Sequence, residues 1–340
     1  MAQSSNPRTE IAVSRPGSTD LFRSTATIEC LEVRAQLLKE LRAFFDELGF
    51  TEVQTPVLSR HTVIDRHIDP IMVAMETSES NGTSDWYLQS SPEATMKRLL
   101  ACGMKKIYQV GPVFRAGEIG RLHNPEFTLA EWYRVDDDLE AGLQLLDDLT
   151  RTLLETPSCV RIRFADAFQS AIDLDVMNAS ISDLAHRAIE LNLVDAMHWS
   201  DDWDDWVNLL FSIVVQPTLG HATPTLVTHF PASQAALAKL AKEDNRLAER
   251  FELFYQGIEL ANGYHELLDP TVLRERNRKA NFDRVRDGKN ALPEESFLLD
   301  AMDSGLPAST GCALGFDRVV MLACRAKHIH DVIAFPSDRA

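Results

Sequence analysis

The order in which strand-like and helix-like segments follow one another constrains the fold of this chain most. Strand-like segments occur in runs, at 107–114 followed by 126–133 and again across 251–267, rather than in strict alternation with helices. Parallel strands need a long crossover connection, usually a helix, whereas consecutive strands joined by short turns pair antiparallel. The order therefore predicts an α+β fold with an antiparallel sheet flanked by helices.

Helical periodicity predicts the elements that cover this sheet. Apolar residues recur at helical spacing across 35–48, and Gly49 follows where that helix would end. Another helix is expected to start at Ser90, with the Glu93 side chain folding back onto a Ser90 cap. The remaining helices are expected at 137–154, 271–286 and 317–327, and the remaining strands at 50–53, 86–88, 226–230 and 313–314.

Length and composition favour one large domain. A chain of 340 residues that is 45% hydrophobic can bury one large core. The first residues are rich in Ser, Pro, Arg and Thr, so we expect 1–28 to form a disordered arm. Residues 29–340 are expected to form a single catalytic domain with a mostly helical insertion at about 161–245.

Apolar stretches and cysteines indicate the compartment. No stretch is long enough to span a bilayer, and the first residues lack the apolar core of a secretion signal. The cysteines are scattered, with no CxxC pair and no histidine at ligand spacing. We therefore expect free thiols in a reducing cytoplasm, with no membrane association, disulfide framework or zinc site.

The charge balance argues against a broad nucleic-acid surface. Asp and Glu outnumber Lys and Arg by 51 to 34, for a formal net charge of −17, whereas non-specific binding to tRNA or DNA depends on neutralising phosphates with cations. The segment 274–289 is an exception because it is rich in Lys and Arg. It is either a solvated helix or a docking face for an acidic protein, with Arg274, Arg276 and Arg278 as the contacts.

The first of three blocks that carry chemistry runs from Phe114 to Tyr133. Arg115 ends one expected strand and Phe127 opens the next, so both would lie at the same end of a hairpin. A guanidinium binds phosphate bidentately, and the ring would stack on adenine. Taken alone, this block is explained at least as well by a surface arginine and a core phenylalanine.

The second block, 252–266, concentrates acidic residues on an expected hairpin. A tight turn at 255–256 would make Glu252 and Glu259 cross-strand neighbours with Cβ atoms about 5 Å apart. Two carboxylates at that distance can share a hard divalent cation. The alternative is a solvated charged face.

The third block, 311–318, is a glycine-rich strand that runs into a helix. Arg318 lies in the first helical turn, an arrangement that suits a phosphate group. A lone glycine-rich turn is as often structural as functional. Together, however, the blocks supply guanidiniums for a triphosphate and carboxylates for its Mg²⁺.

The order and content of these blocks resemble the class II aminoacyl-tRNA synthetases of the lysyl branch. The runs HNPEFT at 123–128, ELANG at 259–263 and ALGFDR at 313–318 are poorly explained by coincidence. The helix at 35–48 with Pro56 resembles the segment that forms the homodimer interface in that class. The resemblance covers about 29–340 and implies a class II catalytic domain, ATP, Mg²⁺ and a homodimer.

Within that class, the chain is similar to the elongation factor P β-lysine ligases. Only about thirty residues precede the motifs, too few for the anticodon-binding domain of a lysyl-tRNA synthetase. The resemblance implies that (R)-β-lysine, or lysine, is activated as its adenylate and transferred to a lysine side chain of elongation factor P. A tRNA partner is not expected.

The resemblance also implies a role for each matching residue. Arg115, Arg318 and Glu259 would be catalytic, and Glu252 and Glu259 would bind Mg²⁺. Nucleotide contacts are expected from Arg115, Glu118, His123, Asn124, Phe127, Glu259, Leu260, Gly315 and Arg318. Amino-acid contacts are expected from Ser91, Glu93, Glu131, Tyr133, Asn262, Glu266 and Ala313. A diamine accounts for the acidic pocket, because each buried ammonium needs a carboxylate or hydroxyl partner.

Two positions depart from the synthetase pattern. Gly117 stands where the first block usually has glutamate, so either Glu118 takes over the contact with the nucleotide amine or that contact is lost. Ala313 stands where the synthetases prefer glycine. The β-lysine ligases resemble this chain, not the synthetases, at this position. The methyl group of Ala313 favours β-lysine over α-lysine by roughly 1–3 kcal/mol.

Two other functions remain open. The chain is otherwise a free-standing lysyl-tRNA-synthetase-like enzyme that forms amides or aminoacylates tRNA, or a weakened paralogue that regulates by binding. Gly117 favours the paralogue, whereas Arg115, Glu259 and Arg318 oppose it. Exchange of pyrophosphate into ATP that depends on an amino acid separates an enzyme from a regulator.

Overall fold

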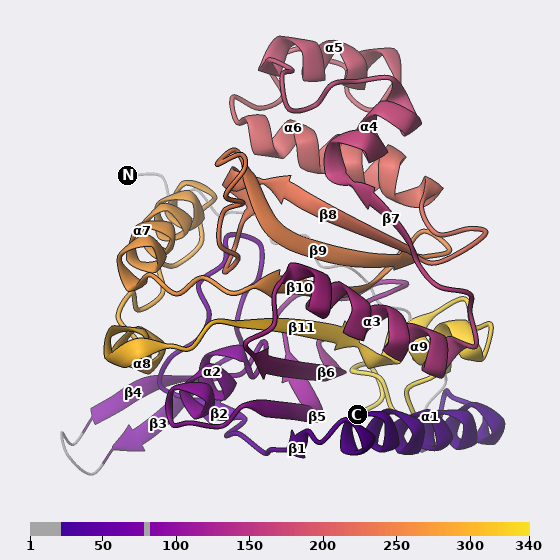
Figure 1. The fold of residues 1–340 in the computed structure, drawn as a ribbon, viewed down its shortest axis with the longest axis vertical. Helices are drawn as coiled ribbons and strands as arrows, with labels where there is room; N and C mark the ends of the chain where they lie inside the picture. The colour runs from indigo at the N-terminus through magenta and orange to yellow at the C-terminus, as the bar shows by residue number, and fades with distance from the viewer. Residues whose placement is uncertain (1–21, 78–81) are drawn as a thin grey trace, which may run out of the picture.

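The structure is a computed structural model and describes residues 22–77 and 82–340 (Figure 1). Most of the arm expected at 1–28 therefore lies outside the described residues. The helices are α1 (Ile28–Glu47), α2 (Glu93–Ala101), α3 (Leu139–Leu154), α4 (Phe164–Ile172), α5 (Ile181–Glu190), α6 (Trp203–Leu210), α7 (Pro270–Arg286), α8 (Phe297–Gly305) and α9 (Phe316–Ala323). The strands are β1 (Thr51–Glu52), β2 (Leu58–Ser59), β3 (Met72–Thr77), β4 (Gly82–Leu88), β5 (Lys106–Phe114), β6 (Glu126–Val135), β7 (Val160–Arg163), β8 (Thr225–Pro231), β9 (Leu247–Tyr255), β10 (Ile258–His265) and β11 (Ser309–Gly315).

An eight-stranded sheet organises the molecule, in the order β1-β5-β6-β11-β10-β9-β8-β7. The inner strands pair antiparallel, as predicted, so the α+β class is confirmed. The two edge pairs, β1–β5 and β7–β8, are parallel. Each edge pair is connected through a helical segment rather than a short turn, and run order alone does not reveal such a connection.

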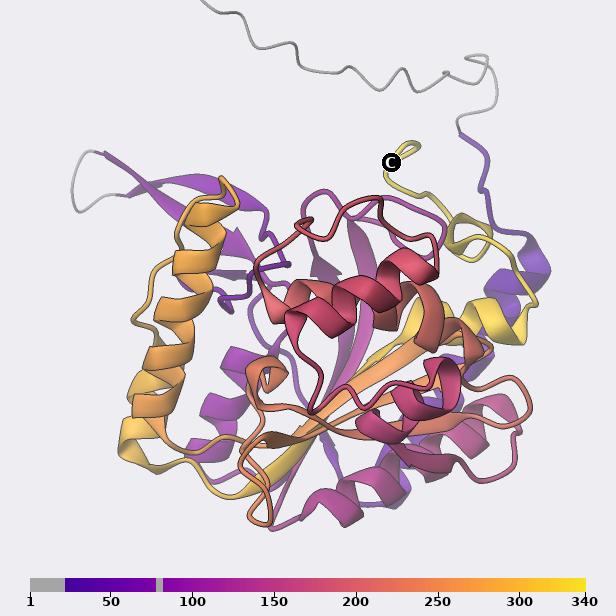
Figure 2. The ribbon, with the colours of Figure 1, turned by 90° about the horizontal axis from the view of Figure 1, so that it is seen from above.

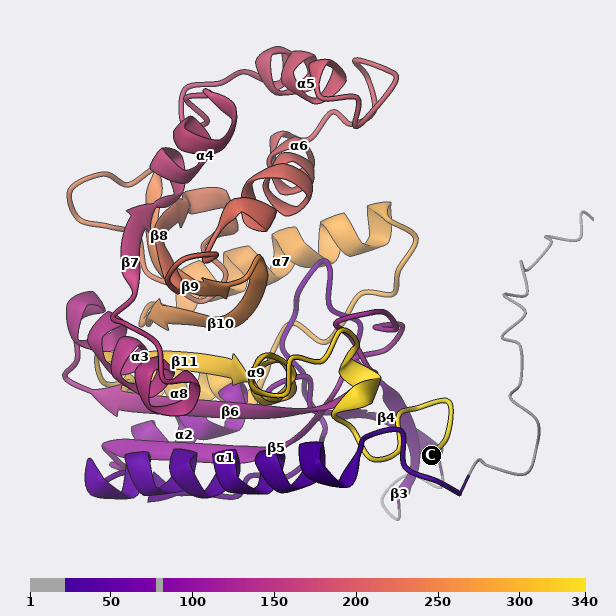
Figure 3. The ribbon, with the colours of Figure 1, turned by 90° about the vertical axis from the view of Figure 1, so that its right-hand side faces the viewer.

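One face of the sheet is covered by α1, α3 and α9 (Figure 3). Helix α1 buries Leu41 and Phe45, and the Phe45 ring stacks on Tyr108 with 4.7 Å between ring centroids. The helix begins earlier than its apolar pattern predicts, because Thr27 caps it by accepting a hydrogen bond from the Cys30 amide at 3.2 Å. It ends where predicted, and Gly49 takes a φ of +72° just beyond the last turn.

The predicted insertion forms helices that cover the far end of the opposite face. Helices α4, α5 and α6 lie above β8 in Figure 1 and share a core with Val227 and Phe254 of the sheet. A π-helix, Phe211–Val215, follows α6 directly. The insertion helices thus pack on the sheet, while β7 and β8 at its two ends extend the same sheet.

The rest of that face is bordered by α2, α7 and α8 and by a small sheet of order β2-β4-β3. Figure 2 shows α7 standing along one side of the molecule, with the insertion helices crossing beside it. The basic helix predicted at 271–286 is confirmed as α7. The helix predicted at 317–327 is confirmed but shorter, since α9 ends at Ala323. Across 22–77 and 82–340, no helix combines the length and apolar character needed to cross a membrane.

Candidate active site

A cavity of about 710 Å³ opens between the sheet, α2, α7 and the insertion. That volume lies within the range of roughly 300–1,000 Å³ typical of small-molecule sites. Its wall brings together the predicted site residues Ser91, Glu93, Arg115, Glu118, His123, Asn124, Phe127, Glu131, Tyr133, Glu252, Glu259, Leu260, Asn262, Ala313, Gly315 and Arg318. Residues more than 200 positions apart therefore face one space, as a shared ligand requires.

Arg115 stands at one end of this cavity, directly after β5. Its guanidinium lies 5.0 Å from the centre of the Phe127 ring, and its Nη1 lies 3.5 Å from Glu118 Oε1. Gly117 has a φ of +76°, a conformation that costs glycine little and places Glu118 back against Arg115. The substitution at Gly117 thus leaves a carboxylate on the cavity wall.

Arg318 projects from the first turn of α9 toward the same end. Its Nη1 donates to the Glu259 carbonyl oxygen at 2.8 Å, and its Nη2 donates to His123 Nε2 at 2.9 Å. A guanidinium has no acceptor atom, so His123 accepts with an unprotonated Nε2. Burial and the Arg318 charge lower the pKa of His123, which keeps the ring neutral and fixes the guanidinium.

The predicted cross-strand pairing of Glu252 with Glu259 is wrong. The turn falls at Gln256 and Gly257, so Glu252 pairs with Asn262 and Glu259 pairs with Phe254, with an irregularity after Glu259. The two carboxylates are diagonal neighbours that still line one cavity. The sequence does not fix this register, because moving a turn by one residue changes every pair in the hairpin.

Glu252 has a partner that the sequence did not reveal. Arg250, two residues earlier on β9, forms an ion pair with Glu252 and donates to the Gln234 carbonyl oxygen at 2.6 Å. Burial raises the pKa of Glu252 to about 7, with Arg250 opposing the shift and Glu259 adding to it. The ion pair engages Glu252 Oε1, which leaves its second oxygen for another ligand.

A Mg²⁺ ion at Glu252 and Glu259 would need donors of the right chemistry. Among the described residues, no group of three or more His, Cys, Asp or Glu side chains is arranged as a metal site. Mg²⁺ commonly uses only one or two carboxylates and takes its other ligands from substrate phosphates and water. The two hard oxygen donors of Glu252 and Glu259 fit that requirement.

The opposite end of the cavity is acidic. Glu131 is 2% exposed and accepts hydrogen bonds from the Ser91 hydroxyl at 2.8 Å and the Tyr133 hydroxyl at 2.6 Å. Burial, with Glu93 nearby, raises the pKa of Glu131 to about 7. An ammonium group entering this end would stabilise the charged carboxylate.

The helix start beside Glu131 differs from the predicted cap. Pro92 is the residue that precedes α2, and the Glu93 amide donates to Ser91 Oγ at 3.0 Å. The Glu93 side chain does not fold back onto Ser90; its Oε1 lies 2.6 Å from Lys97 Nζ. The predicted cap is thus wrong, because an ion pair one helical turn onward takes the carboxylate instead.

Lys97 is a buried residue of this site that sequence reasoning missed. It is 1% exposed, and its Nζ also lies 2.5 Å from Glu266 Oε2. Glu266 is itself 1% exposed and is not among the cavity-lining residues, so it lies behind the wall on which it was predicted. The spacing of four residues between Glu93 and Lys97 is the sequence signal that would have suggested the pair.

Strand β11 closes the acidic end with small residues. A Cβ atom on Gly311 would lie 2.2 Å from Tyr133 Cε1 and 2.5 Å from Glu266 Oε1, so only glycine fits. Ala313 lines the cavity and is paired with Glu131 on one side and Asn262 on the other. Its methyl group is therefore placed among residues predicted to contact the amino acid.

Asn124 has a structural function in addition to its place on the wall. Its Nδ2 donates to the Glu126 carbonyl oxygen at 2.6 Å, and its Oδ1 accepts from the Ser337 amide at 3.1 Å. These bonds tie the C-terminal segment to the loop before β6. The predicted nucleotide contact would use the remaining N–H, and it stays a prediction.

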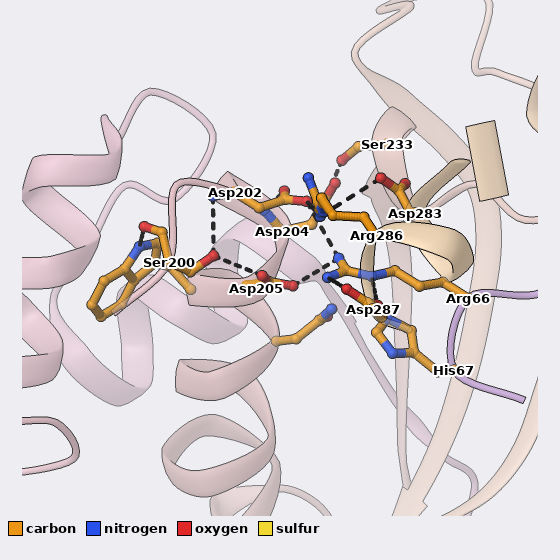
Figure 4. Close-up of polar contacts among 12 residues, drawn as sticks. Arg66, His67, Ser200, Asp202, Asp204, Asp205, Ser233, Asp283, Arg286 and Asp287 are labelled. Carbon is orange, nitrogen blue, oxygen red and sulfur yellow. Dashed lines mark hydrogen bonds and ion pairs between the residues drawn. The ribbon is translucent and has the colours of Figure 1, made fainter. Parts of the chain in front are cut away.

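A second charged cluster includes the cavity-lining residues Arg66 and Asp202 (Figure 4). Arg66, in the loop before β3, lies 3.3 Å from Asp202, 2.8 Å from Asp205 and 2.7 Å from Asp287. Asp202 and Asp205 belong to the start of α6, and Asp287 follows α7. The cluster therefore joins three segments that are distant in the sequence.

Side chains of the basic helix α7 are largely engaged within the chain. Arg274 pairs with Asp303 at 2.6 Å, and Arg276 donates to the carbonyl oxygens of Ala236 and Ala238. Arg284 is 3% exposed. These contacts oppose the docking hypothesis for Arg274 and Arg276, because their charges are already matched or bonded internally.

Known proteins match almost the whole length of the chain. The family model described as tRNA synthetases class II (D, K and N) matches residues 15–339. The chain is similar to the elongation factor P–(R)-β-lysine ligase of Erwinia tasmaniensis, at 42% identity over 321 residues that cover 94% of this chain and 99% of that protein. Ligases of the same name from Salmonella arizonae and Enterobacter sp. are 40% and 41% identical over 322 residues, which cover 95% of this chain and 99% of each.

Proposed function

The chain belongs to the class II tRNA synthetases of the D, K and N group, and from this membership we propose that it is an ATP-dependent ligase. It activates (R)-β-lysine as the adenylate and transfers it to a lysine side chain of elongation factor P. The observation that carries the proposal is the shared cavity, in which two guanidiniums line one end and buried carboxylates line the other.

Activation joins the substrate carboxylate to the α-phosphorus of ATP. One carboxylate oxygen attacks phosphorus, the bond to the bridging oxygen breaks, and pyrophosphate leaves. Arg115 binds the carboxylate and the α-phosphate and so aligns the reacting atoms, while Phe127 stacks on adenine. Arg318, which Glu259 and His123 hold in place, binds the γ-phosphate and stabilises the charge that the leaving group gains.

Glu252 and Glu259 are the residues that would hold Mg²⁺ on the triphosphate. Both present oxygen donors to the cavity, and Arg250 orients Glu252 through its ion pair. Bound Mg²⁺ supplies charge neutralisation for the phosphates. The other positive charges proposed to contact the phosphates are those of Arg115 and Arg318.

The acidic end selects a substrate with two ammonium groups. Glu93 and Glu131 line this end, and the hydroxyls of Ser91 and Tyr133 hold Glu131 in position. A neutral side chain would leave the negative charge of these buried carboxylates only partly compensated, by Lys97 and the two hydroxyls, which is unfavourable. Ala313 reduces the space beside them and favours the β-amino acid.

Transfer completes the reaction without a further cofactor. The neutral amine of the target lysine attacks the carbonyl carbon of the adenylate, AMP leaves, and the amine gives up its proton to solvent. An amide bond forms in place of the mixed anhydride.

Two further properties of the enzyme are its oligomeric state and its compartment. We propose a homodimer through α1, whose Ile28 is 72% exposed and Val33 37% exposed; sedimentation analysis tests it. We also propose that the enzyme works in the cytoplasm, in keeping with five cysteines that form no disulfide.

Transfer of labelled β-lysine tests the proposed function directly. Purified chain, ATP, Mg²⁺ and labelled (R)-β-lysine are incubated with elongation factor P or with total tRNA. Label is expected on elongation factor P and absent from its variant that lacks the target lysine. Label on tRNA alone would identify a free-standing aminoacylator, and no pyrophosphate exchange with any lysine would identify a regulatory paralogue.

A further inference from the structure

Arg34, on α1, joins two segments that border the phosphate end of the cavity. Its Nη1 forms an ion pair with Asp317, and its Nη2 donates to Thr128 Oγ1 at 2.7 Å. We propose that Arg34 is a positioning residue for ATP, because it holds together the segments that carry Phe127 and Arg318. The inference rests on the proposed function, in which those two residues bind the adenine and the γ-phosphate.

The three polar groups meet where the pairing of β6 with β11 ends. Leu129 and Gly315 are the last paired residues, and α9 begins directly after Gly315. Thr128 lies beyond that pair, and its amide donates to Asp317 Oδ2 at 2.6 Å. The other oxygen of Asp317 pairs with Arg34. Arg34, Asp317 and Thr128 therefore form a closed ring of three contacts, which replaces the sheet pairing at this point.

Two members of this ring are next in sequence to residues that are proposed to bind ATP. Thr128 follows Phe127, and Asp317 precedes Arg318. Phe127 and Arg318 both line the cavity. A change in the ring would thus move the adenine contact relative to the γ-phosphate contact. Misplacement of a binding group by about 1 Å can cost roughly 100-fold in rate.

The surroundings of Arg34 favour arginine over any other cation. Its side chain is 19% exposed and that of Asp317 is 3% exposed, so water screens this ion pair poorly. The guanidinium also lies 5.2 Å from the centre of the buried Phe316 ring. A planar guanidinium can contact the carboxylate and the Thr128 hydroxyl together, whereas a lysine ammonium is a single point of charge.

The alternative is that Arg34 only anchors α1 to the rest of the fold. Arg42, on the same helix, is the matched control for that role, because it pairs with Glu52 of β1 at 3.1 Å. Neither Arg42 nor Glu52 is among the residues that line the cavity. Loss of the Arg42 contact should therefore affect the attachment of α1 without affecting ATP.

The test compares Arg34→Met, Arg34→Lys and Arg42→Met with the wild type. Titration calorimetry with ATP and Mg²⁺ gives the Kd for ATP without any amino acid present. Pyrophosphate exchange gives kcat/KM for ATP and, separately, the KM for (R)-β-lysine. Thermal unfolding gives Tm, and sedimentation analysis shows whether each variant keeps the oligomeric state of the wild type.

We expect Arg34→Met to lower kcat/KM for ATP about 10- to 100-fold and to leave the KM for (R)-β-lysine within about threefold of wild type. Its Kd for ATP should rise as well. Arg34→Lys should restore most of the Tm, because Asp317 keeps a cationic partner, but only part of the ATP affinity, because the contact with Thr128 is lost. Arg42→Met should stay within about twofold of wild type in every constant, since exposed ion pairs contribute little.

A wild-type Kd for ATP in folded Arg34→Met would overturn the inference. So would ATP affinity that simply follows Tm across the variants, or a loss of ATP binding that accompanies a changed oligomeric state. If Arg34→Met does not fold, Arg34→Lys decides by the same constants, and if neither folds, the positioning role is rejected. Wild-type protein that binds no ATP would also reject it. Wild-type protein that binds ATP but gives no exchange with any lysine would instead remove the proposed function.

Discussion

Two charged clusters beside one cavity differ in how deeply they are buried. The floor cluster, Glu93, Lys97, Glu131 and Glu266, is almost completely buried, with Lys97 1% exposed and the Glu266 side chain fully covered. The mouth cluster, Arg66, Asp202, Asp205 and Asp287, has side chains that are 16–30% exposed. In the floor cluster each charge has a close partner or hydroxyl donors, whereas in the mouth cluster three aspartates share Arg66, and Arg286 contacts only Asp202 among them.

The difference shows what each cluster is able to do. Water screens the mouth cluster, so an excess of negative charge there is tolerated and contributes little to stability. The floor cluster has no such screening, and its excess of three carboxylates over one ammonium becomes favourable when a cationic ligand arrives. Binding selectivity is therefore expected at the floor, and the mouth is expected to hold segments together weakly.

The largest expected effect tests whether exposure alone explains this contrast. Arg318 and Arg66 have side chains that are 20% and 16% exposed, a close match, but only Arg318 is predicted to bind phosphate. Arg318→Ala should lower kcat/KM for pyrophosphate exchange about 100- to 1,000-fold, because charge stabilisation of the leaving group is lost. The matched control, Arg66→Ala, should stay within a few-fold of wild type. Equal losses in the two variants would mean that position in the cavity does not matter.

A smaller effect is expected from Ala313, which lines the cavity beside Glu131 of the floor cluster. Ala313→Gly enlarges the space between Glu131 and Asn262 and should shift the ratio of kcat/KM for α-lysine over (R)-β-lysine by about 10- to 100-fold toward α-lysine. The measurement is pyrophosphate exchange with each amino acid. An unchanged ratio would show that substrate choice is set elsewhere.

The pH dependence of the protein's stability should reveal the burial of Glu131 in the floor cluster. Glu131 has a pKa of about 7 in the folded protein against 4.5 for an ordinary glutamate. The folded state thus binds a proton more readily than the unfolded state, so stability falls as pH rises from about 4.5 to 7 and stays reduced above. Glu131→Gln removes this ionisation and should raise Tm at pH 8 by roughly 2–5 °C, with no gain at pH 5. A lower Tm at pH 8 would show that the charged carboxylate stabilises the ligand-free protein.

The smallest effect is expected at the mouth. Arg66→Ala should reduce the free energy of unfolding by about 1 kcal/mol or less, since partly exposed ion pairs contribute little. The loss measured in urea should shrink further in 0.5 M NaCl, because salt screens the pairs in the wild type. A loss of several kcal/mol that is insensitive to salt would remove the contrast between the two clusters.

The fold was predictable where local patterns determine it. The run order of strands gave the antiparallel centre of the sheet, and the apolar stripe with Gly49 gave α1 and its end. The parallel edge pairs were missed because they depend on where distant segments meet. The β9–β10 register was missed because the turn is formed by Gln256 and Gly257, whereas the prediction placed it at Tyr255 and Gln256.

The site was predictable where motifs carry it. Arg115, Glu259 and Arg318 were expected on one cavity and lie on one. Lys97 and Arg250 were not expected, since a lysine on an amphipathic helix and an arginine in a strand are ordinarily surface residues. Their burial follows from tertiary contacts with Glu266 and Glu252, which no local pattern encodes.

Pyrophosphate exchange by the wild-type chain, with α-lysine, (R)-β-lysine and (S)-β-lysine compared side by side, tests the central claim most directly. The account predicts exchange that depends on added amino acid, with the highest kcat/KM for (R)-β-lysine. Folded protein that gives no exchange with any of the three would contradict it.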